Sequence, residues 1–248
     1  MGRLETNDWI VLNDIIYLIY STKDTEEMQR LFLERIRKEI SYDAADFFLA
    51  DCEDPNKLSQ GVTVGMRSDS ALKYDELDYN RDIRCSGRSM VYRSSDTIPD
   101  ERRINTPYYD KVYRANDLHY SLQMMIGYEG RFLGLITLYR KKAGGDFDYY
   151  DIFTLDVLKD HISLSISKRL SAEKLSEIFD VDGFVLKYAL TKREAEVLRH
   201  IIRRQDNVSI SKELVISMNT LKKHERNIYK KCGVKSRMQL FKLLSRGI

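Results

Sequence analysis

The stretch TLKKHERNIYKKCG, residues 220 to 233, concentrates basic residues on a segment with helical spacing. On a helix, four of these cations share one face, with Asn227 at its edge. They are Lys222, Lys223, Arg226 and Lys230. A solvated helix face usually mixes acids with bases because opposite charges stabilise each other, but Glu225 is the single acid in this stretch. The pattern therefore favours a helix that binds nucleic acid, with an ordinary solvated face as the alternative.

Capping signals around this stretch divide the C-terminal part of the chain into four short helices. The expected N-terminal caps are Thr191 with Glu194, Asp206 or Asn207, Ser217, and Ser236 with Gln239. Gly233 would end the third helix in a left-handed conformation. The expected inward residues of the first three helices are Ala195, Leu198, Ile201, Ile202, Ile210, Leu214, Leu221, His224, Ile228 and Cys232. In the last helix, Met238, Phe241 and Leu244 are expected to be buried or interface residues. Four short helices joined by tight turns predict a helix-turn-helix domain.

Charge is divided unequally along the 248 residues, although the net charge is only +3. From Lys187 onward there are 16 Lys and Arg against 5 Asp and Glu, and upstream there are 25 against 33. An acidic body with a basic end suits a phosphate-rich partner, because concentrated positive charge releases counterions there. The sequence shows no long apolar span and no secretory signal, and its three cysteines are far apart. We expect a cytoplasmic protein that has no membrane association, no metal site, no cofactor and no disulfide bond.

The upstream part alternates helical and strand patterns. Residues 8–20 and 24–40 show helical spacing, and Met28, Leu31, Phe32, Ile36 and Ile40 would share a stripe. Residues 43–51 and 61–66 are predicted strands, and residues 51–117 are expected to be rich in loops. Residues 121–140 predict a hairpin that turns at Glu129 and Gly130. The stretch 146–170 returns to helix, with a stripe formed by Leu155, Leu158, Ile162, Ile166 and Leu170.

This order of helices and strands resembles a GAF domain over roughly residues 10 to 170. The resemblance is carried by the sequence MIGYEGRFLGLITLYR followed by FDYYDIFTLDVLKDHISLSIS. The resemblance implies an antiparallel sheet flanked by helices, related to PAS domains, that often holds a small ligand between sheet and loops. With the C-terminal helices, the expected class is α+β followed by an all-α domain. We expect a GAF-like sensor or dimerisation domain at 1–170, a linker at 171–186 and a DNA-binding domain at 187–248.

The C-terminal sequence closely resembles the LuxR-type helix-turn-helix in three stretches: LTKREAEVLRHII, then IS, then NTLKKHERNIYKKCGVKSRMQL. In that family the third helix enters the major groove. Carried over, Lys222, Lys223 and Arg226 would face bases or nearby phosphates. The remaining expected DNA-binding residues, Thr220, Asn227 and Lys230, would contact the DNA backbone. Arg193 and Glu194 match a family pair that we interpret as structural, and Arg204 departs from a family glycine.

These features predict a transcription regulator rather than an enzyme. We expect an N-terminal domain that senses an unidentified small molecule or signal, a homodimer, and a near-palindromic site on double-stranded DNA. The alternative is a ligand-free dimerisation or protein-docking scaffold joined to the same DNA-binding module. A response regulator is disfavoured because the chain starts with a helix instead of an acid-ended strand. An acyl-homoserine lactone receptor is disfavoured because Trp9 is the only tryptophan and lies too early.

Several N-terminal residues are ambiguous. Tyr109 and Tyr113 lie one helical turn apart and could line a pocket or pack in a core, and the same holds for Met124 and Met125. His119 is expected to be a hydrogen-bonded core or surface histidine rather than a base, because no catalytic or metal spacing surrounds it. An anionic ligand or plain solvation would explain the arginines at 81, 84, 88 and 93, and Cys85 is a candidate redox sensor. The sequence identifies no catalytic, metal or effector-binding residue.

Overall fold

A computed structural model of the chain describes residues 6–51, 54, 57–66, 70–84, 86–178, 181–203 and 205–244. The chain divides into two compact units, Met1–Ser167 and Lys168–Ile248. Cys52, Cys85 and Arg204 lie outside the described residues.

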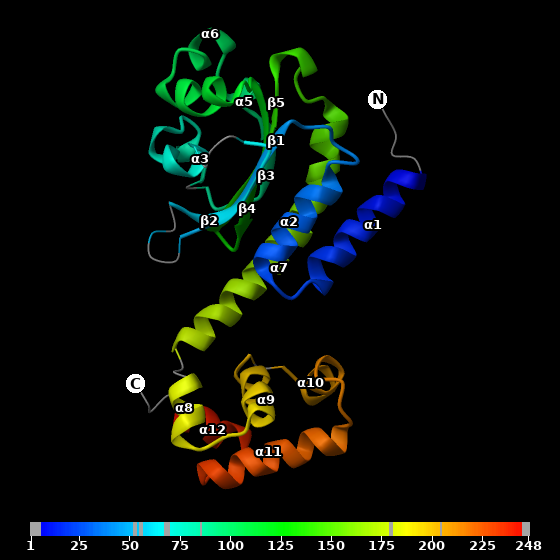
Figure 1. Ribbon diagram of the computed structural model, residues 1–248, viewed down its shortest axis with the longest axis vertical. Helices are drawn as coiled ribbons and strands as arrows, with labels where there is room; N and C mark the ends of the chain where they lie inside the picture. Colours follow the sequence, from blue (N-terminus) through cyan, green and yellow to red (C-terminus); the bar gives the residue numbers. More distant parts are fainter. Residues whose placement is uncertain are drawn as a thin grey trace. The chain divides into compact units, whose positions relative to one another are not determined.

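The N-terminal unit is built on one antiparallel sheet in the order β2-β1-β5-β4-β3. Its strands are β1 (Ala44–Ala50), β2 (Leu58–Val64), β3 (Met90–Arg93), β4 (Tyr120–Tyr128) and β5 (Arg131–Arg140). The long helices are α1 (Thr6–Ser21), α2 (Thr25–Ile36) and α7 (Tyr149–Ile178). Figure 1 shows α1, α2 and α7 on one side of the sheet and α3, α5 and α6 on the other.

The side of the sheet away from α2 is covered by short elements. They are α3 (Ser70–Lys73), η1 (Asp75–Leu77), α4 (Arg81–Arg84), α5 (Ser94–Thr97), α6 (Asp100–Arg103), the π-turn η2 (Tyr109–Tyr113) and η3 (Arg114–Asn116). A further short turn, η4 (Lys142–Gly144), precedes α7. The sequence predicted loops here because four-residue elements are too short to show a period. We call this region, residues 70–116, the cover segment.

Apolar spacing explains the packing on the helical side. Met28, Phe32 and Ile36 of α2 are buried, and the Phe32 ring meets the Phe47 ring edge-on with centroids 5.8 Å apart. Leu155, Leu158, Ile162 and Ile166 of α7 are fully buried, as their stripe predicted. Leu31 and Leu170, which were expected in these stripes, are only half-buried. The hairpin turns at Glu129 and Gly130, which both have positive φ, at 50° and 75°.

The C-terminal unit is entirely helical in its described residues (Figure 1). After the end of α7 it contains α8 (Val181–Lys187), α9 (Lys192–Ile202), α10 (Asn207–Glu213), α11 (Met218–Cys232) and α12 (Arg237–Leu244). The four predicted helices are therefore present. Residues 181–186, which the sequence assigned to a linker, belong to helix α8, and Val181 packs into the same core as Leu198, Leu221 and Ile228.

Candidate nucleic-acid interface

Helix α11 begins and ends where its capping residues predicted. The Ser217 Oγ accepts a hydrogen bond from the Thr220 N–H at 3.1 Å. At the other end Gly233 has φ +66°, and the Val234 N–H donates to the Tyr229 carbonyl at 2.9 Å. These caps satisfy backbone groups that the helix itself leaves open. The helix is therefore fixed over Met218–Cys232, and so is the direction in which each side chain points.

One face of α11 enters the core of the unit. Leu221, Ile228 and Cys232 are buried in it, and Glu225 is buried on the same side. The Glu225 Oε2 accepts a hydrogen bond from Asn207 Nδ2 at 3.2 Å. His224, which the sequence placed in this stripe, is only half-buried. Because Glu225 points inward, the exposed face loses the single acid that the sequence had assigned to the stretch.

The other face of α11 carries the cations. Lys222, Lys223, Arg226 and Lys230 are all exposed, as is Thr220, and Asn227 is half-buried. Within the part of the chain that the structure describes, none of the four cations forms an ion pair. Their mutual repulsion is therefore left uncompensated by acidic side chains of the same unit.

The neighbouring helices α9 and α10 both pack against α11 and have well-defined caps of their own. Asp206 caps α10 by accepting from the Val208 and Ser209 N–H groups, each at 2.9 Å. The Arg193 guanidinium donates to the Leu214 carbonyl at 2.6 Å, at the turn between α10 and α11. Thr191 and Glu194 form the predicted capping box of α9. Arg193 and Glu194 thus have structural contacts, as interpreted from the sequence.

Lys231 follows Lys230 in the sequence but points elsewhere. Its Nζ donates to Glu194 Oε2 at 2.7 Å and to the Ala189 carbonyl at 2.9 Å. Burial raises the pKa of Glu194, but hydrogen bonds from Lys231 and Thr191 outweigh this and hold the pKa below its usual range. Lys231 therefore joins α11 to α9, and the cations left for a partner are those at 222, 223, 226 and 230.

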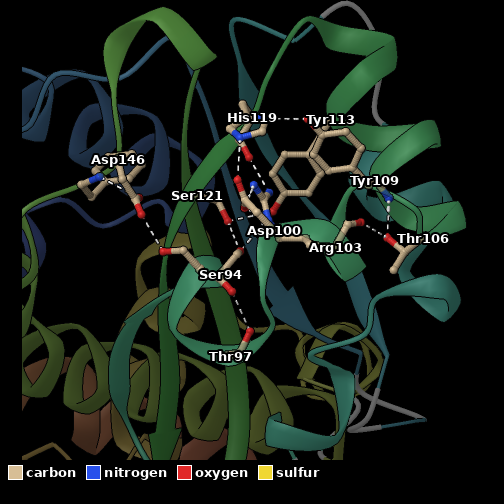
Figure 2. Close-up of polar contacts among 12 residues, drawn as sticks. Ser94, Thr97, Asp100, Arg103, Thr106, Tyr109, Tyr113, His119, Ser121 and Asp146 are labelled. Atoms are coloured by element: carbon tan, nitrogen blue, oxygen red, sulfur yellow. Dashed lines mark hydrogen bonds and ion pairs between the residues drawn. The ribbon is translucent and has the colours of Figure 1, made fainter.

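In the N-terminal unit, a buried polar network joins the cover segment to β4 (Figure 2). Arg103 is fully buried, and its Nη2 donates to Asp100 Oδ1 at 2.7 Å. Its Nη1 donates to the His119 carbonyl. The guanidinium lies 5.2 Å from the Tyr109 ring centroid and 5.5 Å from that of Tyr113. This arrangement compensates a buried charge with both hydrogen bonds and aromatic faces.

His119 and the two tyrosines are part of the same network. His119 Nδ1 lies 2.6 Å from the Tyr109 hydroxyl, and its Nε2 lies 3.1 Å from Asp100 Oδ2. The Tyr113 hydroxyl lies 2.7 Å from Ser121 Oγ. The Tyr109 and Tyr113 rings stack with centroids 5.2 Å apart. His119 is thus a hydrogen-bonded core histidine, and both tyrosines pack inside the unit.

The arginines upstream of this network have acidic partners of their own. Arg84 is buried, with Nη1 2.5 Å from Asp75 Oδ1 and Nη2 2.8 Å from Asp78 Oδ2. Arg93 Nη2 lies 2.7 Å from Asp96 Oδ1. The sequence offered an anionic ligand or solvation for these side chains, and internal ion pairs explain these two. Next to this group, the buried Asn80 Nδ2 makes no hydrogen bond to the described residues.

A row of polar residues crosses the middle of the sheet, one from each strand. From β2 to β3 they are Thr63, Asp46, Thr137, Gln123 and Tyr92. Asp46 is 1% exposed and accepts from Thr63 Oγ1 at 2.8 Å and from the Tyr139 hydroxyl at 3.1 Å. Ala44 and Phe48 lie two residues before and after Asp46 in β1, so all three side chains point to the same face of the sheet. Ala44 and Phe48 pack in the core beneath the cover segment, so the polar row faces that side.

Asp46 has no cationic partner among the described residues. Burial raises its pKa to about 7, because the hydrogen bonds from Thr63 and Tyr139 offset only part of the desolvation. No sequence signal marks this residue, since the strand AADFFLA has the pattern of any buried strand with one polar position. The described residues contain no cluster of three or more potential metal ligands. None of their helices has the length and apolar character needed to cross a membrane.

Comparisons with known proteins agree with this division. Residues 188–244 match the family described as bacterial regulatory proteins, luxR family. No curated protein matches the sequence. The fold of the N-terminal unit is similar to the GAF domain of a phosphoenolpyruvate-protein phosphotransferase from Acinetobacter, with TM-score 0.51 and 12% identity over 68% of this chain and 97% of that one.

A second solved structure of similar fold is the LBD domain of VqsR from Pseudomonas aeruginosa, with TM-score 0.50 and 13% identity over 67% of this chain and 98% of that one. At these identities the likeness shows the fold alone. The predicted classes, a GAF-like antiparallel sheet flanked by helices and an all-α end, are confirmed. Residues 188–244 therefore belong to the LuxR-family helix-turn-helix, and the N-terminal unit has a GAF-like fold.

Proposed function

We propose that this chain is a transcription regulator that binds double-stranded DNA through the outward face of α11, and that its N-terminal unit controls this binding in response to a small molecule or other signal. The observation that carries the proposal is the exposed group of Lys222, Lys223, Arg226 and Lys230, which has no acidic partner in the described chain. A helix of this width fits the major groove, where Lys and Arg reach guanine acceptors.

The direction of each side chain supports a division of roles. Lys222, Lys223 and Arg226 would face base edges or nearby phosphates. Thr220 and Asn227 flank that group and Lys230 lies one turn further, so these three would contact the DNA backbone. Thr220 also lies in the first turn of α11, where open backbone N–H groups favour a phosphate. Two copies of the chain would match a near-palindromic site.

Salt dependence of DNA binding tests the assignment. Fluorescence anisotropy with a 30-base-pair duplex, first of mixed sequence and then of sequences selected from genomic fragments, gives log K against log salt. The wild-type line should fall steeply, and Lys222→Ala or Arg226→Ala should each reduce the slope by about 1 per copy of the chain. Lys38→Ala, an exposed lysine of the N-terminal unit, is the matched control and should leave the slope unchanged. A flat wild-type line would contradict the proposal.

Two observations bear on the signal and favour different functions for the N-terminal unit. The polar row supports a small ligand with hydrogen-bonding groups, because among the described residues Asp46 has no cationic partner and Asn80 Nδ2 has no hydrogen-bond partner. The tyrosine-rich core beneath the cover segment supports the alternative, a ligand-free dimerisation or docking scaffold. Native mass spectrometry of the freshly purified chain separates them. A bound small molecule that shifts DNA affinity supports sensing, and a ligand-free chain with full DNA affinity supports the scaffold.

A further inference from the structure

Helix α1 is apolar on more than the face it buries. Leu12, Ile15 and Ile19 point inward and are almost completely buried. Four large side chains of the same helix face outward, with exposed fractions from 45% to 75%. They are Trp9, Ile10, Tyr17 and Tyr20. A helix that is apolar on two faces is usually covered on both, because an outward face of this composition loses free energy in water.

The outward residues follow the spacing of a two-helix seam. Trp9, Asn13, Ile16 and Tyr20 are separated by four, three and four residues, which is the spacing of alternating d and a positions in a heptad. Ile10 and Tyr17 then fall at the flanking e positions. Asn13 falls at an a position, where a single asparagine favours a parallel pair in fixed register, since its amide finds a partner only in the equivalent residue.

The charge of α1 excludes anionic partners for this face. The helix contains Asp8 and Asp14 and no Lys or Arg. An anionic lipid surface or a nucleic acid would be repelled, and interfacial membrane helices carry basic residues on their polar side. A second copy of the same face is uncharged along its seam and presents an equivalent apolar stripe.

The area of the face is sufficient for a pair. Large aromatic side chains bury about 150–250 Å² each, so the exposed parts of the four large residues amount to roughly 500 Å² per copy. A symmetric pair would bury roughly 1,000 Å² in total, which is near the lower limit for a specific interface. The helix is already folded, because Ser165 Oγ donates to the Ile19 carbonyl at 3.2 Å and Tyr20 contacts His161. Pairing therefore carries no cost of helix formation.

We propose that α1 is the homodimer interface of this protein: it pairs in parallel with α1 of a second copy, with Trp9, Asn13, Ile16 and Tyr20 along the two-fold seam. The two Asn13 amides hydrogen-bond to each other across it. The α1 pair extends the proposed function, in which two copies bind a near-palindromic site. Only the biological role of the pair rests on that function. The pairing itself forms without DNA.

Cross-linking tests the seam and its direction together. In a full-length chain with Cys52 and Cys85 replaced by serine, Asn13→Cys should form an intermolecular disulfide under mild oxidation, because parallel pairing places residue 13 beside its own copy. Asp14→Cys, one residue further and off the seam, is the matched control and should stay monomeric on a non-reducing gel. Equal cross-linking of both variants, or none for Asn13→Cys, would overturn the parallel α1 pair.

Sedimentation equilibrium without DNA tests the interface independently. Wild type should be dimeric at micromolar concentration, and Trp9→Ser with Tyr17→Ser should weaken the dimer at least 100-fold while circular dichroism stays unchanged. Leu77→Ser, an exposed apolar residue of the cover segment at 44% exposure, is the control and should remain dimeric. A monomeric wild type, or a double variant that is still dimeric, contradicts the proposal. A dimer that fails to bind DNA contradicts the proposed function instead.

Discussion

Lys231 Nζ lies 2.7 Å from Glu194 Oε2, whereas the preceding residue, Lys230, is exposed about 100° further round the same helix. Two adjacent lysines therefore have different roles. One compensates a buried carboxylate inside the helix-turn-helix, and the other belongs to the surface proposed to meet DNA. The sequence alone treats them as one basic run, so this pair provides a direct experimental separation of stability from binding.

Lys231→Ala should destabilise the C-terminal unit by about 1–3 kcal/mol, because the Glu194 carboxylate, whose side chain is 4% exposed, loses its cation. Urea unfolding followed by circular dichroism measures this. Lys230→Ala is the matched control: it should leave unfolding unchanged and weaken DNA binding at low salt. The assignment is wrong if both variants lose the same stability, or if Lys231→Ala alters only DNA affinity.

The ends of the helices in this unit allow a reciprocal test. Both α10 and α11 are followed by a left-handed residue, Val215 at φ +52° and Gly233 at φ +66°. A β-branched residue is strained in this region, and Val215 is 88% exposed and loses little packing when replaced. Val215→Gly should therefore raise the free energy of unfolding by about 0.5–1 kcal/mol. Gly233→Val should lower it by at least about 1 kcal/mol. Differential scanning calorimetry should show melting temperatures that move in opposite directions, and a loss of stability in Val215→Gly would refute the strain argument.

Arg103 and Arg114 provide a second matched pair, in the N-terminal unit. Both form ion pairs within one helical turn, with Asp100 and Asp110, and both lie over the Tyr109 ring. The Arg103 side chain is fully buried, whereas that of Arg114 is 61% exposed. Arg103→Met should cost about 3 kcal/mol, because it leaves the His119 carbonyl without its donor inside the core.

Arg114→Met should change stability by no more than about 0.5 kcal/mol, since exposed ion pairs contribute little. Chemical unfolding of the two variants under identical conditions gives the comparison. Similar losses for both would show that the buried network in Figure 2 contributes no more than a surface pair.

Local signals predicted the parts of this molecule that depend on local structure. The caps at Thr191, Ser217 and Gly233 could be predicted because capping depends on residues within one helical turn. The long helices and the hairpin followed from periodicity and from the Glu129-Gly130 turn. β3 could not be predicted, because four residues carry no period and its place depends on pairing with β4. The inward direction of Glu225 was also missed, since it depends on Asn207 in another helix.

The buried charges show the same limit more strongly. Arg84 reads as one of several loop arginines, and only the fold brings Asp75 and Asp78 to it. Asp46 is one polar residue in an apolar strand. Only the register of the five strands places it in a polar row, where no cation of the described residues pairs with it. A sequence records which residues can pair, but contacts between distant segments decide which ones do.

Asp46 should make the stability of the N-terminal unit depend on pH in a direction opposite to that of an ordinary carboxylate. Its pKa is about 7 in the folded chain, raised from 3.8 by burial, so between these values the folded state holds a proton that the unfolded state has lost. Its stabilising contribution is therefore complete below pH 3.8 and is lost as pH rises to about 7.

Asp46→Asn keeps a neutral side chain at every pH. The melting temperature of the variant relative to wild type should rise from pH 4 to pH 8, by an amount equivalent to no more than about 4 kcal/mol. Differential scanning fluorimetry across this range measures the difference, and Asp43→Asn, on an exposed neighbouring acid, is the control that should show no such trend. A constant difference for Asp46→Asn would mean that the carboxylate stays ionised in the folded protein, with a cation or donor supplied from outside the described residues.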